Sequence, residues 1–491
     1  MTRRIVEHRP VQQEIVHDGT DSREPSVAGP PFPSRLCSLS MGMTITPQVG
    51  QTHSENICIS KKFIYTIVKA DLLIPGDGEP MAHAALVAEE KLIVWVGTQD
   101  NLPVRYIEKA RRIHTVPYLM PGLWDCHAHL MTGGEDEATW PPYMGFVAGD
   151  PVADGARLGR LCWEILQRGY TSIRDLAGYG CEIAKPINEG TIPGPNIYSS
   201  GACISQLAGH GDVFSIPAGD VLLSLGVGQI RPGHFATKPS CIVNGQDECR
   251  LGVRLQIRRG AKCIKILASG GVMSSDDDPT LAQFSPGELE VLVDEATRFN
   301  RAVAAHVHGI PGILAAVKAG VTTVEHASFA DEECIRLIKE KNIVYVATRE
   351  AIQIIPTIGH GVPKRVLDKA KLVAAHHMMA YKAAVKAGVT FALGTDATSM
   401  LTMARELEWA VEAGLSNLEA LKAATANGPL TVKGQAPKTG QLKVGYEADF
   451  IGVIENPVDD VKVLQKVDNI KWVWKGGKLF KGPGVGPWGE A

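Results

Sequence analysis

The sequence is poor in several features that would point to other kinds of protein. Its 491 residues carry a net charge of -3 and no long run of Lys or Arg, so we expect neither a nucleic-acid partner nor a membrane partner. A hydrophobic fraction of 45% with a mean hydropathy near zero argues against disorder and fits a soluble protein of two or three domains. A small-molecule substrate is therefore the simplest expectation.

The ten cysteines lack the spacing of a small disulfide or zinc scaffold. No Cys-x-x-Cys pair occurs, and several cysteines, such as Cys126 and Cys263, lie inside apolar runs typical of strands. We therefore expect most thiols to be reduced. The first twenty residues are rich in charge and contain no apolar core of the length that a secretory signal needs, so no conventional signal peptide is predicted.

The two ends of the chain differ in composition from its middle. Residues 1–60 are polar and contain clustered prolines, which predicts a flexible leader. Residues 61–118 alternate short β-branched and apolar runs with turns, including a predicted hairpin tip at residues 89–91. Residues 438–491 have the same character and a Gly476-Gly477 turn. We expect both segments to build one small β-sandwich domain.

Residues 119–437 alternate short apolar strands with helix-like stretches rich in alanine, lysine, glutamate and leucine. That alternation predicts an α/β fold in which crossover helices join parallel strands. Strands are predicted at residues 119–129, 170–175, 196–201, 263–269, 301–308, 322–326, 343–348 and 390–396. Eight such units fit a (β/α)8 TIM barrel. An open doubly wound sheet is the alternative, but no Gly-x-Gly-x-x-Gly motif opens a helix after an early strand.

The ends of the predicted strands are rich in groups that bind metals or carry protons. His127 and His129 stand two residues apart, so an extended strand places both imidazoles on the same face. In a TIM barrel the C-terminal strand ends surround the active site, which would bring other candidates to this pair. These candidates are Lys265, His306, His308, His326 and Asp396. Each alone could be a core or capping residue, but their joint placement predicts a metal centre.

Imidazoles combined with a carboxylate are typical ligands of zinc. The four imidazoles of His127, His129, His306 and His326, together with Asp396, exceed what one catalytic zinc binds, since such a site keeps a position open for water. Two ions are therefore more natural. A two-metal site can hold a bridging hydroxide as nucleophile and polarise the bond under attack.

Short motifs carry most of these groups: Asp125-Cys126-His127-Ala128-His129, Ile264-Lys265-Ile266, His306-Val307-His308-Gly309, Glu325-His326 and Gly394-Thr395-Asp396. Together they resemble the metal-dependent amidohydrolase superfamily, and in particular its prolidase-like amide hydrolases. The resemblance implies two Zn²⁺ ions bridged by hydroxide and by Lys265, carboxylated on its side-chain nitrogen. It places His127, His129 and Asp396 on the first ion, and His306 and His326 on the second.

The same resemblance suggests roles for the remaining polar groups. Asp396 would accept a proton from the attacking hydroxide and deliver it to the leaving amine. His210 or His308 would donate a hydrogen bond to the substrate carbonyl oxygen. Arg349 would pair with a substrate carboxylate or else form a surface salt bridge. Lys262 competes with Lys265 for carboxylation, but its odd separation places it on the opposite face of the strand.

Three functions are compatible with this pattern. The first is carboxypeptidase-like hydrolysis of an amide to an amino acid, with N-acyl amino acids or dipeptide-like molecules as substrates. The second is hydrolysis of a cyclic amide or deamination on the same scaffold, since fold alone does not decide the reaction. The third is a catalytically inactive scaffold protein. The resemblance also implies a homo-oligomer, such as an octamer, and secretion, whereas the absence of a visible signal leaves a cytoplasmic location open.

Overall fold

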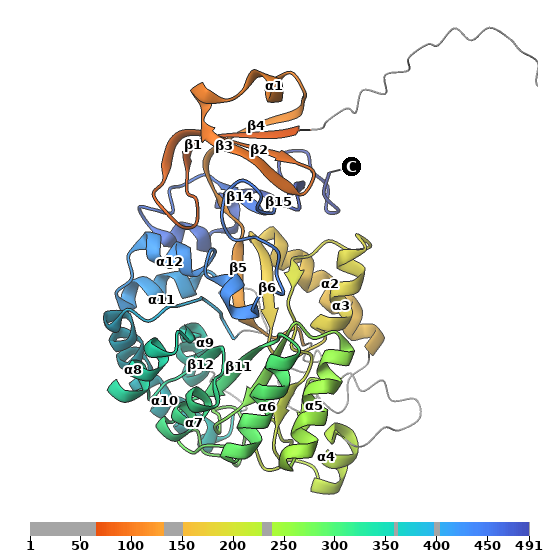
Figure 1. The fold of residues 1–491 in the computed structure, drawn as a ribbon, viewed down its shortest axis with the longest axis vertical. Coiled ribbons are helices and arrows are strands. Elements are labelled where there is room, and N and C mark those ends of the chain that lie inside the picture. The colour runs from red at the N-terminus through yellow and green to blue at the C-terminus, as the bar shows by residue number, and fades with distance from the viewer. Residues whose placement is uncertain (1–64, 132–150, 228–237, 358–361, 397–402, 491) are drawn as a thin grey trace, which may run out of the picture. The chain divides into compact units, whose positions relative to one another are not determined.

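The computed structural model describes residues 65–131, 151–227, 238–357, 362–396 and 403–490 (Figure 1). The predicted flexible leader, residues 1–60, lies outside these ranges. Within them, no helix is long and apolar enough to cross a membrane. The cysteines that the structure describes are buried and free, as expected for reduced thiols.

Strands from the early and late parts of the chain form one seven-stranded sheet. Its members are β1 (Tyr65–Leu73), β2 (Met81–Glu89), β3 (Leu92–Thr98), β4 (Ala110–Pro121), β14 (Phe450–Val453), β15 (Ile470–Lys475) and β16 (Lys478–Lys481). The order is β16-β15-β14-β4-β1-β2-β3, so the early strand β4 lies beside the late strand β14, with Met120 opposite Ile451. The two-layer β-sandwich stays a prediction, because this strand order describes a single sheet.

The middle of the chain forms the α/β part of the fold. Its strands are β5 (Leu123–Ala128), β6 (Tyr170–Asp175), β7 (Asn196–Ile197), β8 (Cys203–Ser205), β9 (Ser240–Ile242), β10 (Cys263–Leu267), β11 (Ala302–Val307), β12 (Thr323–His326) and β13 (Val344–Val346). They pair in parallel as β5-β6-β7 and as β13-β12-β11-β10-β8-β9. The pairing agrees with the predicted parallel α/β arrangement.

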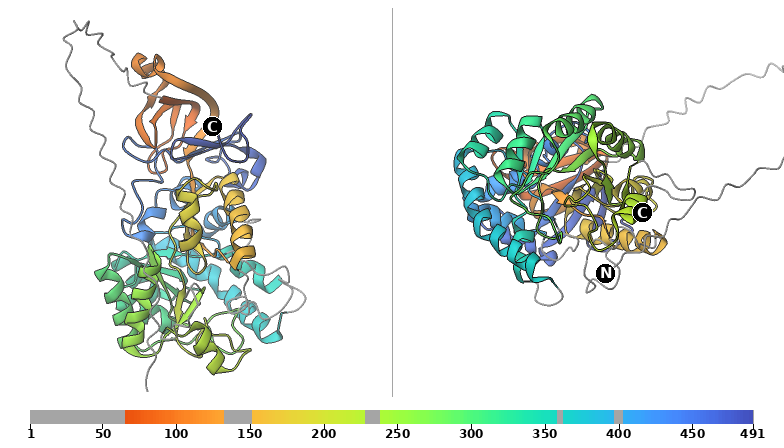
Figure 2. Two further views of the ribbon diagram at one scale, coloured as in Figure 1. Left: turned by 90° about the vertical axis from the view of Figure 1, so that its right-hand side faces the viewer. Right: turned by 90° about the horizontal axis from the view of Figure 1, so that it is seen from below.

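Helices follow most of these strands. They are α2 (Pro151–Gln167), α3 (Gly180–Asn188), α4 (Ala218–Leu225), α5 (Gly245–Arg259), α6 (Pro286–Arg298), α7 (Ile310–Ala319), α8 (Glu332–Glu340), α9 (Arg349–Ile354), α10 (Lys364–Ala387), α11 (Arg405–Ala413) and α12 (Asn417–Ala423); the short α1 (Val104–Ile107) lies in the sheet region. Seen from below, the helices lie around the outside of the strands (Figure 2, right). Helix α8 shows the reason: it buries Ile335 and Ile338 on one face and exposes Glu333 and Arg336 on the other.

The structure differs from the predicted strands at several positions. Residues 390–396 form no regular strand but a single bridge, between Tyr345 and Phe391. The short strands β8 and β9 have too few residues to show a two-residue periodicity, and the sequence did not predict them.

A single residue, Gly122, separates β4 from β5. The sequence predicted one strand over residues 119–129, and the structure corrects this: the strand is interrupted here and ends at Ala128, so His129 follows it. A side chain at Gly122 would place its Cβ 2.1 Å from the Thr171 hydroxyl, which explains the need for glycine. The seven-stranded sheet is thereby joined directly to the strand that carries His127.

Candidate metal centre

Four of the predicted ligands converge, two from the end of β5, one from the middle of β10 and one from the segment that follows α10. The Nε2 atoms of His127 and His129 lie 3.3 and 2.9 Å from Asp396 Oδ1. Lys265 Nζ lies 3.2 Å from His127 Nε2 and is almost fully buried. Nitrogen and oxygen donors at these separations can share an ion, so the residues present fit the implied metal.

A second group is formed by His306, His308 and His326, whose ring nitrogens lie within 4.8 Å of one another. The rings of His308 and His326 stack with their centroids 4.9 Å apart, and His306 meets both edge-on. His326 also lies 4.0 Å from Asp396, which connects the two groups. The structure thus brings together all six predicted ligands and adds His308 to the second group.

Glu325 is a functional candidate to which the sequence analysis gave no role. Its carboxylate accepts a hydrogen bond from Nδ1 of His127 at 2.8 Å, which leaves Nε2 of that ring directed at Lys265 and Asp396. The same carboxylate pairs with Arg174 at 2.9 Å, and both side chains of that ion pair are fully buried. A charged residue inside a four-residue buried strand was the signal that could have identified it.

Burial sets the protonation of the centre. It is the main cause that lowers the pKa of Lys265, partly offset by the charges of Glu325 and Asp396. Burial also lowers the pKa of His306 and His326 well below the ordinary value. For Asp396 burial acts in the opposite sense, yet the neighbouring imidazoles hold its pKa well below its usual range. These directions favour neutral imidazoles at His306 and His326 beside an ionised carboxylate at Asp396, the forms that metal ligation requires.

The backbone is strained at two of the candidate ligands. His326 has a φ of 66° and Asp396 a φ of 56°, in the left-handed region that residues with side chains rarely occupy. Thr348 has a φ of 52°, and its side-chain hydroxyl oxygen is hydrogen-bonded to Nδ1 of His326 at 2.6 Å. Such conformations concentrate at functional sites, where surrounding contacts hold them in place.

His210 reaches this centre from the loop after β8. Its ring stacks on His306 with centroids 4.4 Å apart, and its Nδ1 lies 2.9 Å from the Ser274 hydroxyl. Asp277 lies 3.5 Å from the same nitrogen. The structure therefore brings His210 beside a candidate ligand, and its contact with a substrate carbonyl oxygen stays a prediction.

Arg349 is placed differently from the other predicted site residues. Its guanidinium donates hydrogen bonds to the Gln353 side chain and to the backbone oxygen of Ala374, and it lies 5.7 Å from the Trp409 ring centre. These contacts are with α9, α10 and α11 rather than with the histidines. Burial lowers its pKa. A role in binding a substrate carboxylate stays a prediction.

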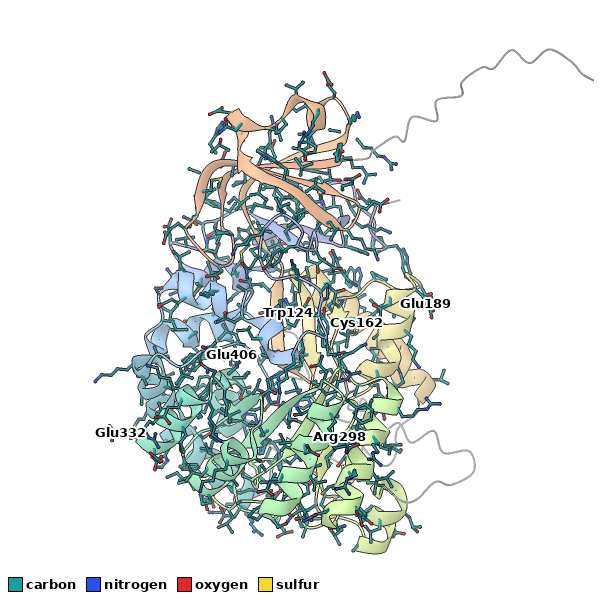
Figure 3. All side chains as sticks on the ribbon, in the orientation of Figure 1. Trp124, Cys162, Glu189, Arg298, Glu332 and Glu406 are labelled. Atoms are coloured by element: carbon teal, nitrogen blue, oxygen red, sulfur yellow. The ribbon has the colours of Figure 1, made fainter. Side chains whose placement is uncertain are left out.

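A small cavity lies behind the centre. Trp124 of β5 and Glu406 of α11, both labelled in Figure 3, line it together with Asp125 and Thr395. Burial raises the pKa of Glu406 to about 8. Asp125 accepts hydrogen bonds from the backbone of His127 and from the Thr395 hydroxyl, so it joins the end of β5, which carries His127, to the segment that carries Asp396.

Known proteins resemble this chain over nearly its whole length. The model of the amidohydrolase family matches residues 118–480. An ochratoxinase from Aspergillus niger is 53% identical over 492 residues, which cover 100% of this chain and 98% of that protein. The crystal structure of A. niger ochratoxinase matches with a TM-score of 0.83 and 57% identity, over 87% of this chain and 98% of the other. A Xaa-Pro dipeptidase solved with methionine in its active site matches with a TM-score of 0.74 and 26% identity, over 85% of this chain and 100% of the other.

Proposed function

The chain belongs to the amidohydrolase family and hydrolyses amide C–N bonds, and from this premise we propose that it is a binuclear zinc enzyme that releases an amino acid from an acyl group. The observation that carries the proposal is the convergence of His127, His129, Lys265 and Asp396 from three separate parts of the chain. The lowered pKa of Lys265 supports its carboxylation, because the neutral amine is the form that reacts with carbon dioxide.

Two zinc ions bound there would supply the activation of a water nucleophile and the polarisation of the amide carbonyl. The residues of the chain perform the remaining steps. Asp396 accepts the proton of the attacking water and returns it to the departing amine nitrogen. Glu325 keeps Nδ1 of His127 protonated, so that Nε2 faces the metal. His210 or His308 donates a hydrogen bond to the substrate carbonyl oxygen.

The substrate that we propose is ochratoxin A, which would be split into ochratoxin alpha and phenylalanine. This choice rests on the likeness to ochratoxinase, of which the chain covers nearly the full length. The likeness to a Xaa-Pro dipeptidase supports a wider class of N-acyl amino acids and dipeptides. In each of these substrates an amide nitrogen belongs to an amino acid, as a carboxypeptidase-like reaction requires.

We also propose that the two parallel sheets close into a (β/α)8 barrel over residues 119–437. Backbone hydrogen bonds support closure: Cys126 N of β5 donates to Leu393 O at 2.8 Å, and Tyr345 N of β13 donates to Thr390 O at 2.9 Å. Residues 390–396 would then take the place of the eighth strand. This arrangement puts the candidate ligands at the C-terminal ends of the strands, where such barrels carry their active sites.

The proposal is tested by cleavage assays with mass-spectrometric detection on a panel of N-acyl amino acids, dipeptides and ochratoxin A, combined with elemental analysis. We expect about two zinc ions per chain and release of phenylalanine from ochratoxin A. Asp396→Asn should lower kcat by about 100-fold or more, since general acid–base catalysis contributes roughly 10²- to 10⁴-fold. Asp368→Asn, at an exposed ion pair with Lys364, is the control. Activity of Asp396→Asn within a few-fold of the parent protein would exclude the proton transfer that we assign.

A further inference from the structure

A buried lysine fixes the loop that follows β10. Lys369 of α10 is 8% exposed, and its ammonium donates to the backbone oxygens of Gly271 and Ser274 at 2.7 and 2.6 Å. It also pairs with Asp277 Oδ1 at 2.9 Å. A buried ammonium is costly unless it is paired and hydrogen-bonded, and here three acceptors meet that requirement. The loop is therefore held firmly against α10.

The same loop surrounds His210. Asp277 Oδ2 accepts a hydrogen bond from Gly271 N at 2.8 Å and lies 3.5 Å from His210 Nδ1. Burial opposes ionisation of Asp277, but His210 and Lys369 together hold its pKa well below the usual range. Gly271 packs flat on the imidazole, since a Cβ built there would lie 2.1 Å from its Cε1 atom.

His210 is thus enclosed on three sides. Its second face rests on the ring of His306, a candidate metal ligand from another strand. Ser274 and Asp277 occupy the side of Nδ1, so the ring cannot rotate without breaking both contacts. The ion pair with Lys369 keeps Asp277 in its ionised, accepting form.

We propose that Asp277 and Lys369 are positioning residues that act through His210, holding its Nδ1 side so that the Nε2 side is presented to the substrate. The inference rests on the proposed amide hydrolysis. It adds a carboxylate–ammonium pair that is not itself a candidate metal ligand to the groups on which turnover depends. Removing the Asp277 charge should lower kcat while leaving zinc binding intact.

The test is a double-mutant cycle on the zinc-loaded full chain. Asp277→Asn and His210→Ala should each lower kcat by about 10-fold or more with little change in KM, and the double variant should be no slower than His210→Ala alone. Asp276→Asn, at the neighbouring exposed ion pair with Arg365, is the matched control and should keep the parent kcat. A proton NMR spectrum gives a readout that does not depend on activity: a downfield imidazole N–H signal should vanish in His210→Ala and move in Asp277→Asn.

Losses that add in the double variant would overturn the inference, because they would show that Asp277 acts independently of His210. If Asp277→Asn folds poorly, Gly271→Ala replaces it, since it displaces the ring while retaining the ion pair. It should slow the parent protein but not the His210→Ala variant, and equal slowing of both contradicts the proposal. A parent chain that binds two zinc ions but cleaves no amide would instead refute the proposed function, and the inference with it.

Discussion

Replacing Glu325 by Gln should damage both the stability of the protein and its affinity for zinc. The substitution keeps the size of the side chain but removes the charge that lies between Arg174 and His127. The carboxylate accepts hydrogen bonds from both Arg174 and His127, whereas a glutamine amide has one accepting oxygen and one donating NH2 group. The NH2 group would therefore face a donor of Arg174 or of His127 across about 3 Å. The change is therefore confined to the charge and the hydrogen bonds of one buried side chain.

The expected size of the effect follows from burial. Arg174 and Glu325 are both fully buried, and breaking a buried pair from one side costs about 3–5 kcal/mol because the remaining charge is uncompensated. In a chain of 491 residues, with about 2.1 cal/mol/K of unfolding entropy per residue, a loss of this size lowers Tm by roughly 3–5 °C. Loss of the carboxylate that orients His127 should weaken zinc binding by about 10- to 100-fold.

The contribution of Glu325 to folding stability should decrease at low pH. The Arg174 charge and the hydrogen bond from His127 outweigh burial and lower the pKa of Glu325 to about 2. A carboxyl whose pKa is depressed in the folded state stabilises the protein above its unfolded pKa of about 4.3 and loses that contribution as the pH falls. The stability difference between parent and variant should therefore be complete at pH 6 and shrink below about pH 4.

Thermal unfolding with and without zinc separates the two effects, because bound metal raises Tm by mass action. Zinc content after dialysis against a metal buffer measures the affinity. Glu333→Gln, at an exposed ion pair with Arg336, is the control and should leave both quantities unchanged. If Glu325→Gln matched this control in Tm and in zinc content, the assigned role of the Arg174–Glu325–His127 chain would be wrong.

Three further predictions concern other residues of the centre. Lys265→Met keeps the apolar stem but cannot be carboxylated, so elemental analysis should find fewer than two zinc ions per chain; the exposed Lys262→Met, as control, should retain both. Gly394→Ala places a Cβ 2.5 Å from the backbone nitrogen of His127 and should lower the stability by about 1–3 kcal/mol in urea unfolding, whereas Gly219→Ala, which meets no neighbour, should not. Because burial raises the pKa of Glu406 to about 8, its folded form holds a proton that the unfolded chain releases above about pH 4.3, so stability falls as the pH rises from there to 8. Glu406→Gln should abolish that decline and raise Tm at pH 9 but not at pH 5, and a parallel shift at both values would contradict this reasoning.

Strand alternation was enough to place several side chains from the sequence. His127 and His129 both reach Asp396, although His129 directly follows the strand, and Lys265 is buried beside them whereas Lys262 is exposed. These relations depend on the local two-residue period of a strand, which neighbouring residues determine. They could be predicted because no distant part of the chain was needed to define them.

Other features depend on contacts that no local pattern reveals. The pairing of Asp277 with Lys369 joins a loop to a helix far along the chain. In the sequence alone, each of the two residues resembles an ordinary surface charge. Residues 390–396 have the apolar composition of a strand, yet they pair through isolated hydrogen bonds because neighbours on both sides decide their geometry. Tertiary packing decided these cases and not intrinsic propensity.

The pairing of β4 with β14 has a consequence for how the protein is made. During synthesis β4 can pair with β1 as soon as both have left the ribosome, but its other edge has no partner until residues 450–453 emerge. At about 5–20 residues per second, that edge is exposed on the order of tens of seconds. An open strand edge is a template for pairing with other chains, so the nascent polypeptide is most prone to aggregation in this interval. Slow translation or an arrested ribosome should therefore favour misfolding at the strand that leads into the first histidines.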